Sequence, residues 1–243
     1  MRTIAIIQAR MGSSRLPGKV LKKLGRATVL SNVVERVRRS RRINDVAVAT
    51  TREPADAEIV QECSNAGITI FRGSTEDVLD RYYEAALQLK AEVVVRITAD
   101  CPLIDPDLID LTVQAFLADR PDYASNVLTR TYPRGLDTEV FSVETLQRAW
   151  QEAAAPYERA HVTPYIYNHP RRFRLLSVSG SDDFSSHRWT LDTPEDLDFL
   201  QQVYARFPEA NDFSWRAVLA LLVREPALSL INSHVQQKQL QEG

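Results

Sequence analysis

The first residues able to do chemistry form the run Ala9-Arg10-Met11-Gly12-Ser13-Ser14-Arg15-Leu16-Pro17-Gly18-Lys19. Cationic side chains neutralise phosphate charge, and glycines let backbone N–H groups approach phosphate oxygens. The run therefore predicts a loop that binds a polyphosphate; the alternative is a surface loop with scattered charge. It is not a P-loop, because five residues separate Gly12 from Gly18 and Val20 replaces the Ser or Thr that would hold magnesium.

Two aspartates follow short segments that read as strands. Asp100 comes shortly after the apolar run Val93–Ile97, and Asp192 directly follows the segment Arg188–Leu191. Carboxylates at neighbouring strand ends are suited to share a Mg²⁺ ion. The alternative for Asp100 is that it organises the turn before Pro102. The other polar residues of these segments have simpler readings: Asp105 and Asp196 as helix caps, and Cys101 as a packing residue.

The elements that must position these residues alternate along the first half of the chain. Nearly continuous apolar runs are typical of parallel strands buried on both faces, and they alternate with segments of helical periodicity. This pattern predicts βαβ units in a doubly wound α/β sheet. The expected strands are Thr3–Ala9, Val46–Ala49, Ile68–Phe71 and Val93–Ile97, and the expected helices are Val29–Ser40, Ala55–Asn65 and Asp77–Lys90.

The pattern changes after Phe116, where we expect an inserted segment that builds a second wall of the site. Its expected strands are Tyr123–Leu128, Glu139–Ser142 and Arg174–Val178, with a helix over Val143–Ala154 and a helical or turn-rich stretch over Tyr157–Asn168. Regular order returns with a helix that begins at Pro194 and is capped by Thr193. A last helix is expected over Ser214–Arg224, and the tail from Gln236 is polar and expected to fray.

Composition excludes several classes of protein. The 243 residues carry a formal net charge of −2, which does not suit a general nucleic-acid binder. No segment approaches the roughly 20 apolar residues of a membrane helix, and no signal peptide is recognisable. The two cysteines, Cys63 and Cys101, suggest a reducing compartment. We therefore expect a cytoplasmic protein.

Together the chemistry-bearing segments resemble the cytidylyltransferases that activate acidic sugars as CMP derivatives, such as the Kdo and sialic-acid enzymes, and most of all the branch of spore coat polysaccharide biosynthesis protein F. The resemblance spans nearly the whole chain. Besides the N-terminal loop, it is carried by Phe71–Ser74, Asp100–Asp105, Tyr132–Asp137, Glu158–Tyr167 and Arg188–Asp196. It implies a three-layer, Rossmann-like nucleotide-diphospho-sugar transferase fold with a mixed, mainly parallel sheet and an inserted acceptor and dimerisation segment.

The resemblance also implies an organisation for the chain. We expect a single domain over residues 1–243, with a nucleotide-binding part at about 1–120 and 186–225. The inserted segment is expected at about 121–185 and a polar tail at 226–243. The family implies CTP as substrate, Mg²⁺ as cofactor and a homodimer as the assembly.

Residue by residue, the resemblance implies a nucleotide site and a metal site. The nucleotide-binding residues would be Met11, Gly12, Ser13, Ser14, Arg15, Lys19, Arg72 and Ser74. Asp100 and Asp192 would hold the metal, and Arg10, Lys19 and Asp100 would be catalytic. Arg72 and Ser74 lie where the family contacts the pyrimidine, although Ser74 is equally well explained as a helix cap with Asp77.

On the acceptor side, the implied residues are Arg134, Asp137, Glu139, Glu158, His161 and Tyr165. An arginine suits a sugar carboxylate because the two groups pair through two parallel hydrogen bonds, whereas His161 is equally well explained as a packed structural residue. Kdo enzymes carry Gln-Gly-Asp-Glu-Pro where this chain has Thr98-Ala99-Asp100-Cys101-Pro102, so the Kdo acceptor itself is not carried over.

The function expected from these residues is transfer of CMP from CTP to an acidic sugar or a related acid, with release of pyrophosphate, for surface polysaccharide. One alternative is a glycosyltransferase that uses a nucleotide sugar, but Asp100 is not part of the Asp-x-Asp motif common in such enzymes. A second alternative is a non-catalytic nucleotide-binding accessory protein. Tight CTP binding without turnover on any acceptor would favour that reading.

Overall fold

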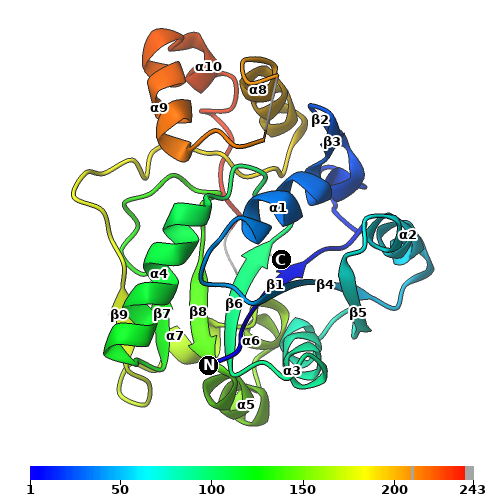
Figure 1. The fold of residues 1–243 in the computed structure, drawn as a ribbon, viewed down its shortest axis with the longest axis vertical. Coiled ribbons are helices and arrows are strands. Elements are labelled where there is room, and N and C mark those ends of the chain that lie inside the picture. Colours follow the sequence, from blue (N-terminus) through cyan, green and yellow to red (C-terminus); the bar gives the residue numbers. More distant parts are fainter. Residues whose placement is uncertain (209–210, 239–243) are drawn as a thin grey trace.

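A seven-stranded sheet forms the centre of the computed structural model, which describes residues 1–208 and 211–238 (Figure 1). The strand order is β5-β4-β1-β6-β8-β7-β9. The first four strands in this order run parallel, β8 is antiparallel to β6 and β7, and β9 is parallel to β7. The mixed, mainly parallel sheet of the Rossmann-like expectation is thereby confirmed. The strands are β1 (Thr3–Gln8), β4 (Asp45–Thr51), β5 (Thr69–Gly73), β6 (Val93–Thr98), β7 (Tyr123–Ser125), β8 (Glu139–Ser142) and β9 (Leu175–Ser177), with a small separate hairpin of β2 (Lys23–Leu24) and β3 (Ala27–Thr28).

The helices begin at residues that cap them. Thr28 and Asp105 accept hydrogen bonds from N–H groups of the first turns of α1 and α4, and Thr193 forms a capping box with Asp196 at α8. The helices are α1 (Val29–Arg38), α2 (Ala57–Asn65), α3 (Val78–Gln88), α4 (Pro106–Asp119), α5 (Val143–Glu152), α6 (Pro156–His161), α7 (Pro164–Tyr167), α8 (Pro194–Ala205), α9 (Trp215–Arg224) and α10 (Ala227–Leu230), with short 3₁₀ turns η1 (Lys19–Leu21) and η2 (Pro54–Asp56).

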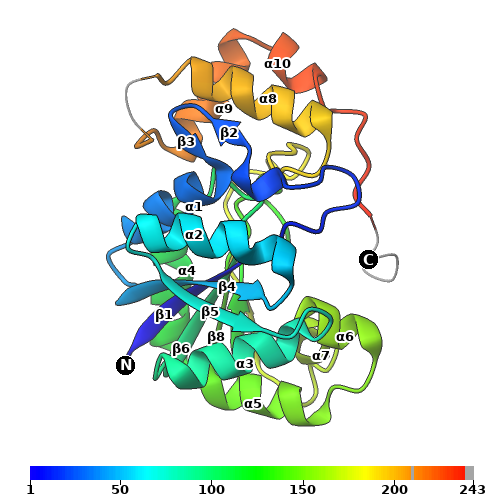
Figure 2. The same ribbon diagram turned by 90° about the vertical axis from the view of Figure 1, so that its right-hand side faces the viewer.

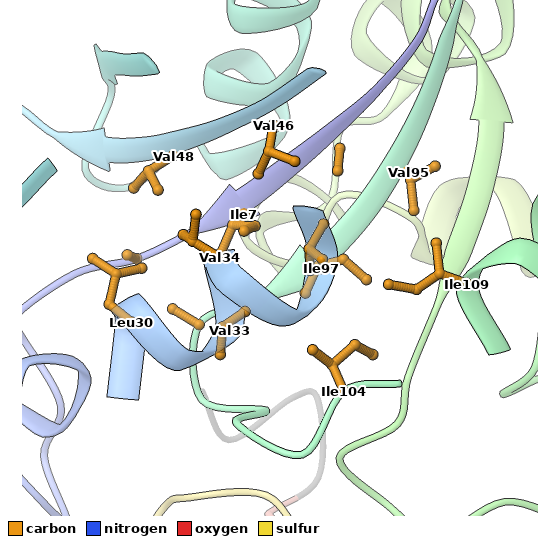
Figure 3. Close-up of a cluster of buried hydrophobic side chains, with 14 of the residues drawn as sticks. Ile7, Leu30, Val33, Val34, Val46, Val48, Val95, Ile97, Ile104 and Ile109 are labelled. Atoms are coloured by element: carbon orange, nitrogen blue, oxygen red, sulfur yellow. The ribbon is translucent and has the colours of Figure 1, made fainter. Parts of the chain in front are cut away.

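The central strands are apolar at most positions because helices cover both faces of the sheet. Successive side chains of a strand point to opposite faces, so Ile4 and Ile6 of β1 contact one core and Ala5 and Ile7 the other. The core around Ile7 packs against α1, α2 and α4. Figure 3 shows its side chains from α1 and from Ile109 of α4 beside those of the strands. The core around Ile6 packs against α3 and α5, and Figure 2 shows α2 and α3 on opposite sides of β4 and β5. These are the three layers of the fold.

A third apolar cluster lies between the loops at the strand ends and the C-terminal helices α8, α9 and α10 (Figure 1). Leu16 of the N-terminal loop, Leu136 and the fully buried Trp189 belong to it. These contacts hold three segments that are distant in sequence against one another. The loops at the carboxyl ends of the strands are therefore held in place by apolar packing against the C-terminal helices.

Two segments differ from the expected elements. Residues 188–191 form no regular strand: Arg188 makes a single parallel bridge with Arg134, and the Leu191 N–H donates to the Asp100 carbonyl at 2.8 Å. Within residues 226–238, α10 forms and Leu228 is buried, so this part is more than a polar tail. Much of the fraying expected from Gln236 falls on residues 239–243, outside the described residues. In the part of the chain described, every helix is too short or too polar to cross a membrane.

Candidate active site

Hydrogen bonds to the backbone of Met11 hold the two ends of the loop that follows β1 together. The Met11 carbonyl accepts hydrogen bonds from the N–H groups of Ser13 (2.9 Å) and Gly18 (3.0 Å). The Met11 N–H in turn donates to Asp56 Oδ1 at 2.7 Å, and Asp56 is buried and bonded to the end of β4. Gly18 has a φ of 66°, a conformation that glycine adopts without strain, and it leads the chain into η1 at Lys19.

Part of this loop is left available for an anion. Within the described residues, the N–H groups of Gly12 and Ser14 donate to no other atom, whereas those of Met11 and Ser13 are already used. The Arg10 side chain is exposed and makes no hydrogen bond or ion pair in the part of the chain described. Among the backbone N–H groups of residues 11–14, those of Gly12 and Ser14 are therefore the ones that remain able to bind an anion.

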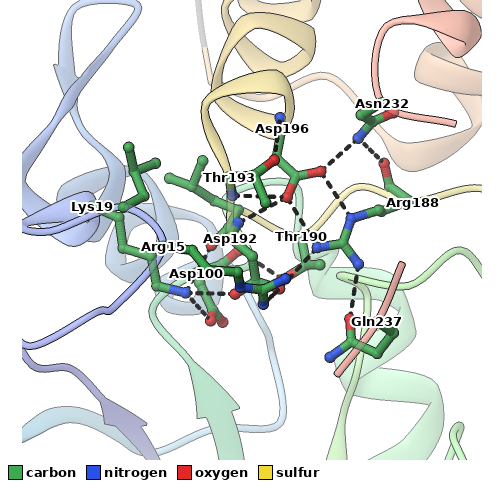
Figure 4. Close-up of polar contacts among 12 residues, drawn as sticks. Arg15, Lys19, Asp100, Arg188, Thr190, Asp192, Thr193, Asp196, Asn232 and Gln237 are labelled. Carbon is green, nitrogen blue, oxygen red and sulfur yellow. Dashed lines mark hydrogen bonds and ion pairs between the residues drawn. The ribbon is translucent and has the colours of Figure 1, made fainter. Parts of the chain in front are cut away.

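Lys19 brings the two predicted aspartates together. Its Nζ donates to Asp100 Oδ2 at 2.7 Å, to Asp192 Oδ1 at 2.8 Å and to the Leu191 carbonyl at 2.7 Å (Figure 4). The side chains are mostly buried, with exposed fractions of 12% for Lys19, 25% for Asp100 and 14% for Asp192. Residues far apart in sequence thus meet at the carboxyl edge of the sheet, where ligands bind in open α/β folds.

Electrostatics stabilises the charged forms of this cluster. Burial alone would lower the pKa of the Lys19 ammonium, but the carboxylates of Asp100 and Asp192 outweigh burial and raise it. Burial likewise favours the neutral form of Asp100, but the Lys19 ammonium and hydrogen bonds, including one at 2.6 Å from Thr98, hold the pKa of that carboxyl below its ordinary value. Burial raises the pKa of the neighbouring Cys101 thiol well above its ordinary value, so this thiol stays neutral.

The donor set of Asp100 and Asp192 fits Mg²⁺ bound together with phosphates. In the described part of the chain, no group of three or more His, Cys, Asp or Glu side chains could hold a metal ion. Mg²⁺ usually retains waters and binds through one or two carboxylates plus substrate phosphates, so two aspartates suffice. The space between these carboxylates already accommodates a cation, because the Lys19 ammonium lies there.

Behind Asp192 lies a second group of polar residues. Arg188 donates to Asp192 Oδ2 at 2.9 Å and makes a two-point contact with Asp196 at 2.8 and 2.9 Å. Arg15 also approaches Asp192, with Nη2 3.1 Å from Oδ2. Burial would raise the pKa of Asp196, but Arg188 and Asn232 outweigh it and lower that pKa. Asp196 therefore caps α8 and also holds Arg188.

The residues expected at the pyrimidine organise their own loops. Arg72 donates to the carbonyls of Thr51 at 2.9 Å and Glu53 at 3.1 Å, which joins the ends of β4 and β5. The Ser74 hydroxyl accepts from the Asp77 N–H at 3.0 Å, and Asp77 itself caps α3. Ser74 therefore organises the turn before α3, and the helix cap is Asp77 and not Ser74 as the alternative expected.

Arg134 differs from the expected acceptor residues Asp137, Glu139 and Glu158, whose carboxylates have partners in the described structure. It is half-buried, and within the described residues its guanidinium makes no hydrogen bond or ion pair. Burial lowers the pKa of Arg134, and the nearby Arg130 lowers it further. Asp137, by contrast, is paired with Arg130 through two contacts of 2.6 and 2.8 Å. The positive charge of Arg130 is thus compensated locally, and that of Arg134 is not.

Three other expected acceptor residues have structural partners. Glu139 is buried, paired with Arg96, and accepts from the hydroxyls of Tyr123 and Thr163 at 2.6 Å each. Glu158 is buried and accepts from the Ala155 N–H at 3.2 Å at the start of α6. The buried Tyr165 donates to Glu152 at 2.6 Å. These contacts explain why the three side chains are buried, without any role in binding the acceptor substrate. His161 is the last residue of α6.

Sequence reasoning missed the residues that hold the site residues in place. Their side chains are polar or charged, and their partners lie either 36 to 45 residues away or 4 to 8 residues away across segments without regular structure, so no helical or strand spacing marks them. They are Asp56, Arg96, Arg130, Arg188 and Asn232. Only Arg188 carried a signal, because it starts the segment Arg188–Asp196 on which the resemblance partly rests.

Comparison with known proteins agrees with this geometry. The family model for cytidylyltransferases matches residues 4–221. The chain is 36% identical to spore coat polysaccharide biosynthesis protein SpsF of Bacillus subtilis over 228 residues, which cover 91% of this chain and 94% of that protein. It is 35% identical to a 3-deoxy-manno-octulosonate cytidylyltransferase of Anaeromyxobacter dehalogenans over 184 residues, 69% of this chain and 74% of the relative. A solved cytidylyltransferase structure from Leptospira borgpetersenii has a TM-score of 0.91 at 34% identity, covering 98% of this chain and 99% of that one. The chain therefore belongs to the cytidylyltransferase family of nucleotidyltransferases.

Proposed function

We propose that this protein transfers CMP from CTP to an acidic sugar of the ulosonic or sialic type, or to a related acid, for the biosynthesis of a surface polysaccharide. The relatives named for Kdo transfer and for spore coat polysaccharide support this choice of acceptor class. The observation that carries the proposal is the meeting of Lys19 with Asp100 and Asp192 beside the loop of residues 10–19.

In the proposed reaction, a hydroxyl oxygen of the acceptor bonds to the α-phosphorus of CTP. The bond between that phosphorus and the bridging oxygen breaks, and pyrophosphate leaves with the electron pair. Such transfers depend mainly on positioning and on neutralising charge. In this proposal, Arg10, Arg15 and Lys19 would neutralise the phosphates, and the N–H groups of Gly12 and Ser14 would donate to phosphate oxygens.

Asp100 and Asp192 would hold Mg²⁺ in this reaction. Bound there with the triphosphate, the ion would neutralise phosphate charge and lower the pKa of the acceptor hydroxyl. The two aspartates would exchange their contact with Lys19 for the metal, and the ammonium would then be free to bind a phosphate oxygen. In this proposal, Lys19 would thus bind the two aspartates before the metal and CTP bind, and a phosphate oxygen of CTP afterwards.

Arg134 is our candidate for binding the carboxylate of the acceptor. It forms the bridge with Arg188, whose segment leads to Asp192, so it lies next to the metal-binding residues. Its guanidinium is half-buried, with Arg130 as a cationic neighbour, and a carboxylate would compensate this charge through two hydrogen bonds. A neutral sugar would lack this interaction.

The test of the proposal is pyrophosphate release with each of CTP, UTP, GTP and ATP, Mg²⁺ and a panel of sugar acids. We expect release with CTP and at least one acid, and no release when the carboxylate is reduced to an alcohol. Asp100→Asn should abolish release, with the exposed Asp107→Asn as a matched control that retains it. Turnover with another nucleotide and none with CTP would contradict the proposal.

The acceptor assignment has its own test. Arg134→Gln should raise the KM for the acid about tenfold or more while leaving the KM for CTP near the native value, because charge-assisted hydrogen bonds contribute about 1.5–3 kcal/mol each. Arg216→Gln is a control with an exposed arginine that stacks on Trp215. An Arg134→Gln variant with an unchanged KM for the acid would place the carboxylate elsewhere.

A further inference from the structure

Asp192 is connected to the C-terminal segment by a buried chain of polar contacts (Figure 4). Arg188 Nη2 donates to Asp192 Oδ2 and to Asp196 Oδ2, at 2.9 Å in both cases, and Arg188 Nε donates to Asp196 Oδ1 at 2.8 Å. Asp196 is fully buried. Because two points of contact fix the plane of the guanidinium, Asp196 determines where Arg188 presents its hydrogen bond to Asp192.

Asp196 also holds the backbone at Asp192. Its Oδ2 accepts from the N–H groups of Asp192 at 2.9 Å and Thr193 at 3.1 Å. The capping interaction expected from the sequence is therefore one part of a larger arrangement. Asp196 fixes Asp192 both through the main chain and, by way of Arg188, through the side chain.

Asn232 completes the arrangement from the far end of the chain. It lies just after α10 and is buried. Its Nδ2 donates to Asp196 Oδ1 at 2.8 Å and to the Arg188 carbonyl at 3.0 Å. One amide group thus holds both partners of the contact that orients Asp192, and replacing it by an apolar side chain removes both hydrogen bonds.

We propose that Asn232 and Arg188 are positioning residues that set the orientation of the Asp192 carboxylate for the metal. The inference rests on the proposed function, in which Asp192 binds the metal of the CTP complex. Groups that orient metal ligands typically change metal affinity by about 10–100-fold when they are removed. We therefore expect Asn232→Leu and Arg188→Lys each to weaken metal binding about tenfold.

Asn32→Leu is a matched control for Asn232→Leu. Asn32 and Asn232 are equally buried, each 3% exposed. The Nδ2 of Asn32 also makes two hydrogen bonds, to the Leu24 and Thr28 carbonyls at 2.9 Å, and these hold the start of α1 rather than the Asp192 segment. A general loss of stability should therefore be similar in both leucine variants, and only a positioning role separates them.

The experiment is a Mn²⁺ titration of the full chain with saturating CTP and no acceptor, followed by the electron paramagnetic resonance signal of free Mn²⁺. We expect a Kd for Mn²⁺ raised about tenfold in Asn232→Leu and Arg188→Lys and unchanged in Asn32→Leu. CTP binding to Asn232→Leu in EDTA should match the native protein, because the loop of residues 10–19 is untouched.

The outcomes separate the two proposals. Native protein that binds no Mn²⁺ with CTP would contradict the proposed function itself. Native protein that binds Mn²⁺, with both Asn232→Leu and Arg188→Lys at the native Kd, would overturn the positioning role alone. If Asn232→Leu does not fold, Arg188→Lys decides, because it retains the charge and loses the two-point contact.

Discussion

Replacing Lys19 by methionine tests whether this ammonium and a divalent cation compete for the same two carboxylates. Methionine keeps much of the length of the side chain and removes its charge. Asp100 would lose its only described ion-pair partner, while Asp192 would keep Arg15 and Arg188. Removing one partner of a buried ion pair costs about 3–5 kcal/mol. Because both carboxylates are partly exposed and Asp192 stays paired, we expect a loss of about 2–3 kcal/mol in metal-free buffer.

A divalent cation should restore this loss in the variant and do little for the native protein. A ligand present at 100 times its Kd stabilises a protein by about 2.7 kcal/mol. In the native protein the metal has to displace an ammonium that lies 2.7 and 2.8 Å from the two carboxylates, so the stabilisation by Mn²⁺ alone should be much smaller. The affinity for CTP should fall in the variant, because it loses the cation that we propose to bind a phosphate of CTP.

The assay is urea unfolding of both proteins in EDTA and in about 10 mM Mn²⁺. This concentration is about 100 times the Kd if the variant binds Mn²⁺ with a Kd of about 0.1 mM. Lys23→Met, which removes an exposed lysine in β2, is the matched control and should respond to Mn²⁺ like the native protein. Adding Asp100→Asn to Lys19→Met should abolish the stabilisation by Mn²⁺. Equal stabilisation of native protein and Lys19→Met by Mn²⁺ would refute the competition.

Three further predictions concern stability. Gly135→Ala should lower the free energy of unfolding by about 3 kcal/mol or more, measured by urea unfolding, because Gly135 has a φ of 108° and a Cβ would lie 2.6 Å from the Trp189 carbonyl carbon. Glu139→Ala should cost about 3–5 kcal/mol by leaving Arg96 buried without its partner; a stable variant with a raised KM for the acid would instead indicate direct acceptor binding. At Asp56, burial raises the carboxyl pKa but hydrogen bonds outweigh it and lower it, so its stabilisation is present in full above about pH 5 and is lost as pH falls through the lowered pKa. The difference in unfolding free energy between native protein and Asp56→Asn should therefore shrink between pH 5 and pH 3, and a constant difference would contradict this assignment.

The parts of the fold that follow from local patterns could be predicted from the sequence. A strand covered on both faces is apolar at most positions, so β1, β4 and β6 stand out as nearly continuous apolar runs. The carboxyl ends of parallel strands meet at one edge of the sheet, which places Asp100 next to the N-terminal loop. Asp192 reaches the same place by another route, because residues 188–191 form only a bridge and not the expected strand.

The role of a polar residue could not be predicted where its partner is distant. Glu139 is an acid near the expected acceptor wall, and nothing in its neighbourhood shows that it is buried. Its partner Arg96 lies directly opposite on β6, a pairing that depends on the register of β8 against β6. The local sequence around Asn232 likewise does not mark it as buried, because only the fold of α10 brings it to Asp196.

If Arg134 binds the acceptor as we propose, charge compensation around its guanidinium favours an acid as that acceptor. Three arginines lie near one another at this end of the sheet, and two of them are compensated: Arg130 by Asp137, and Arg188 by Asp192 and Asp196. Within the described residues, the guanidinium of Arg134 has no such anion. A half-buried cation is costly without a counter-charge, and an acceptor carboxylate supplies one where a neutral sugar does not. The charge of the acceptor, rather than the pattern of its hydroxyl groups, is thus the property that this arrangement is expected to select first.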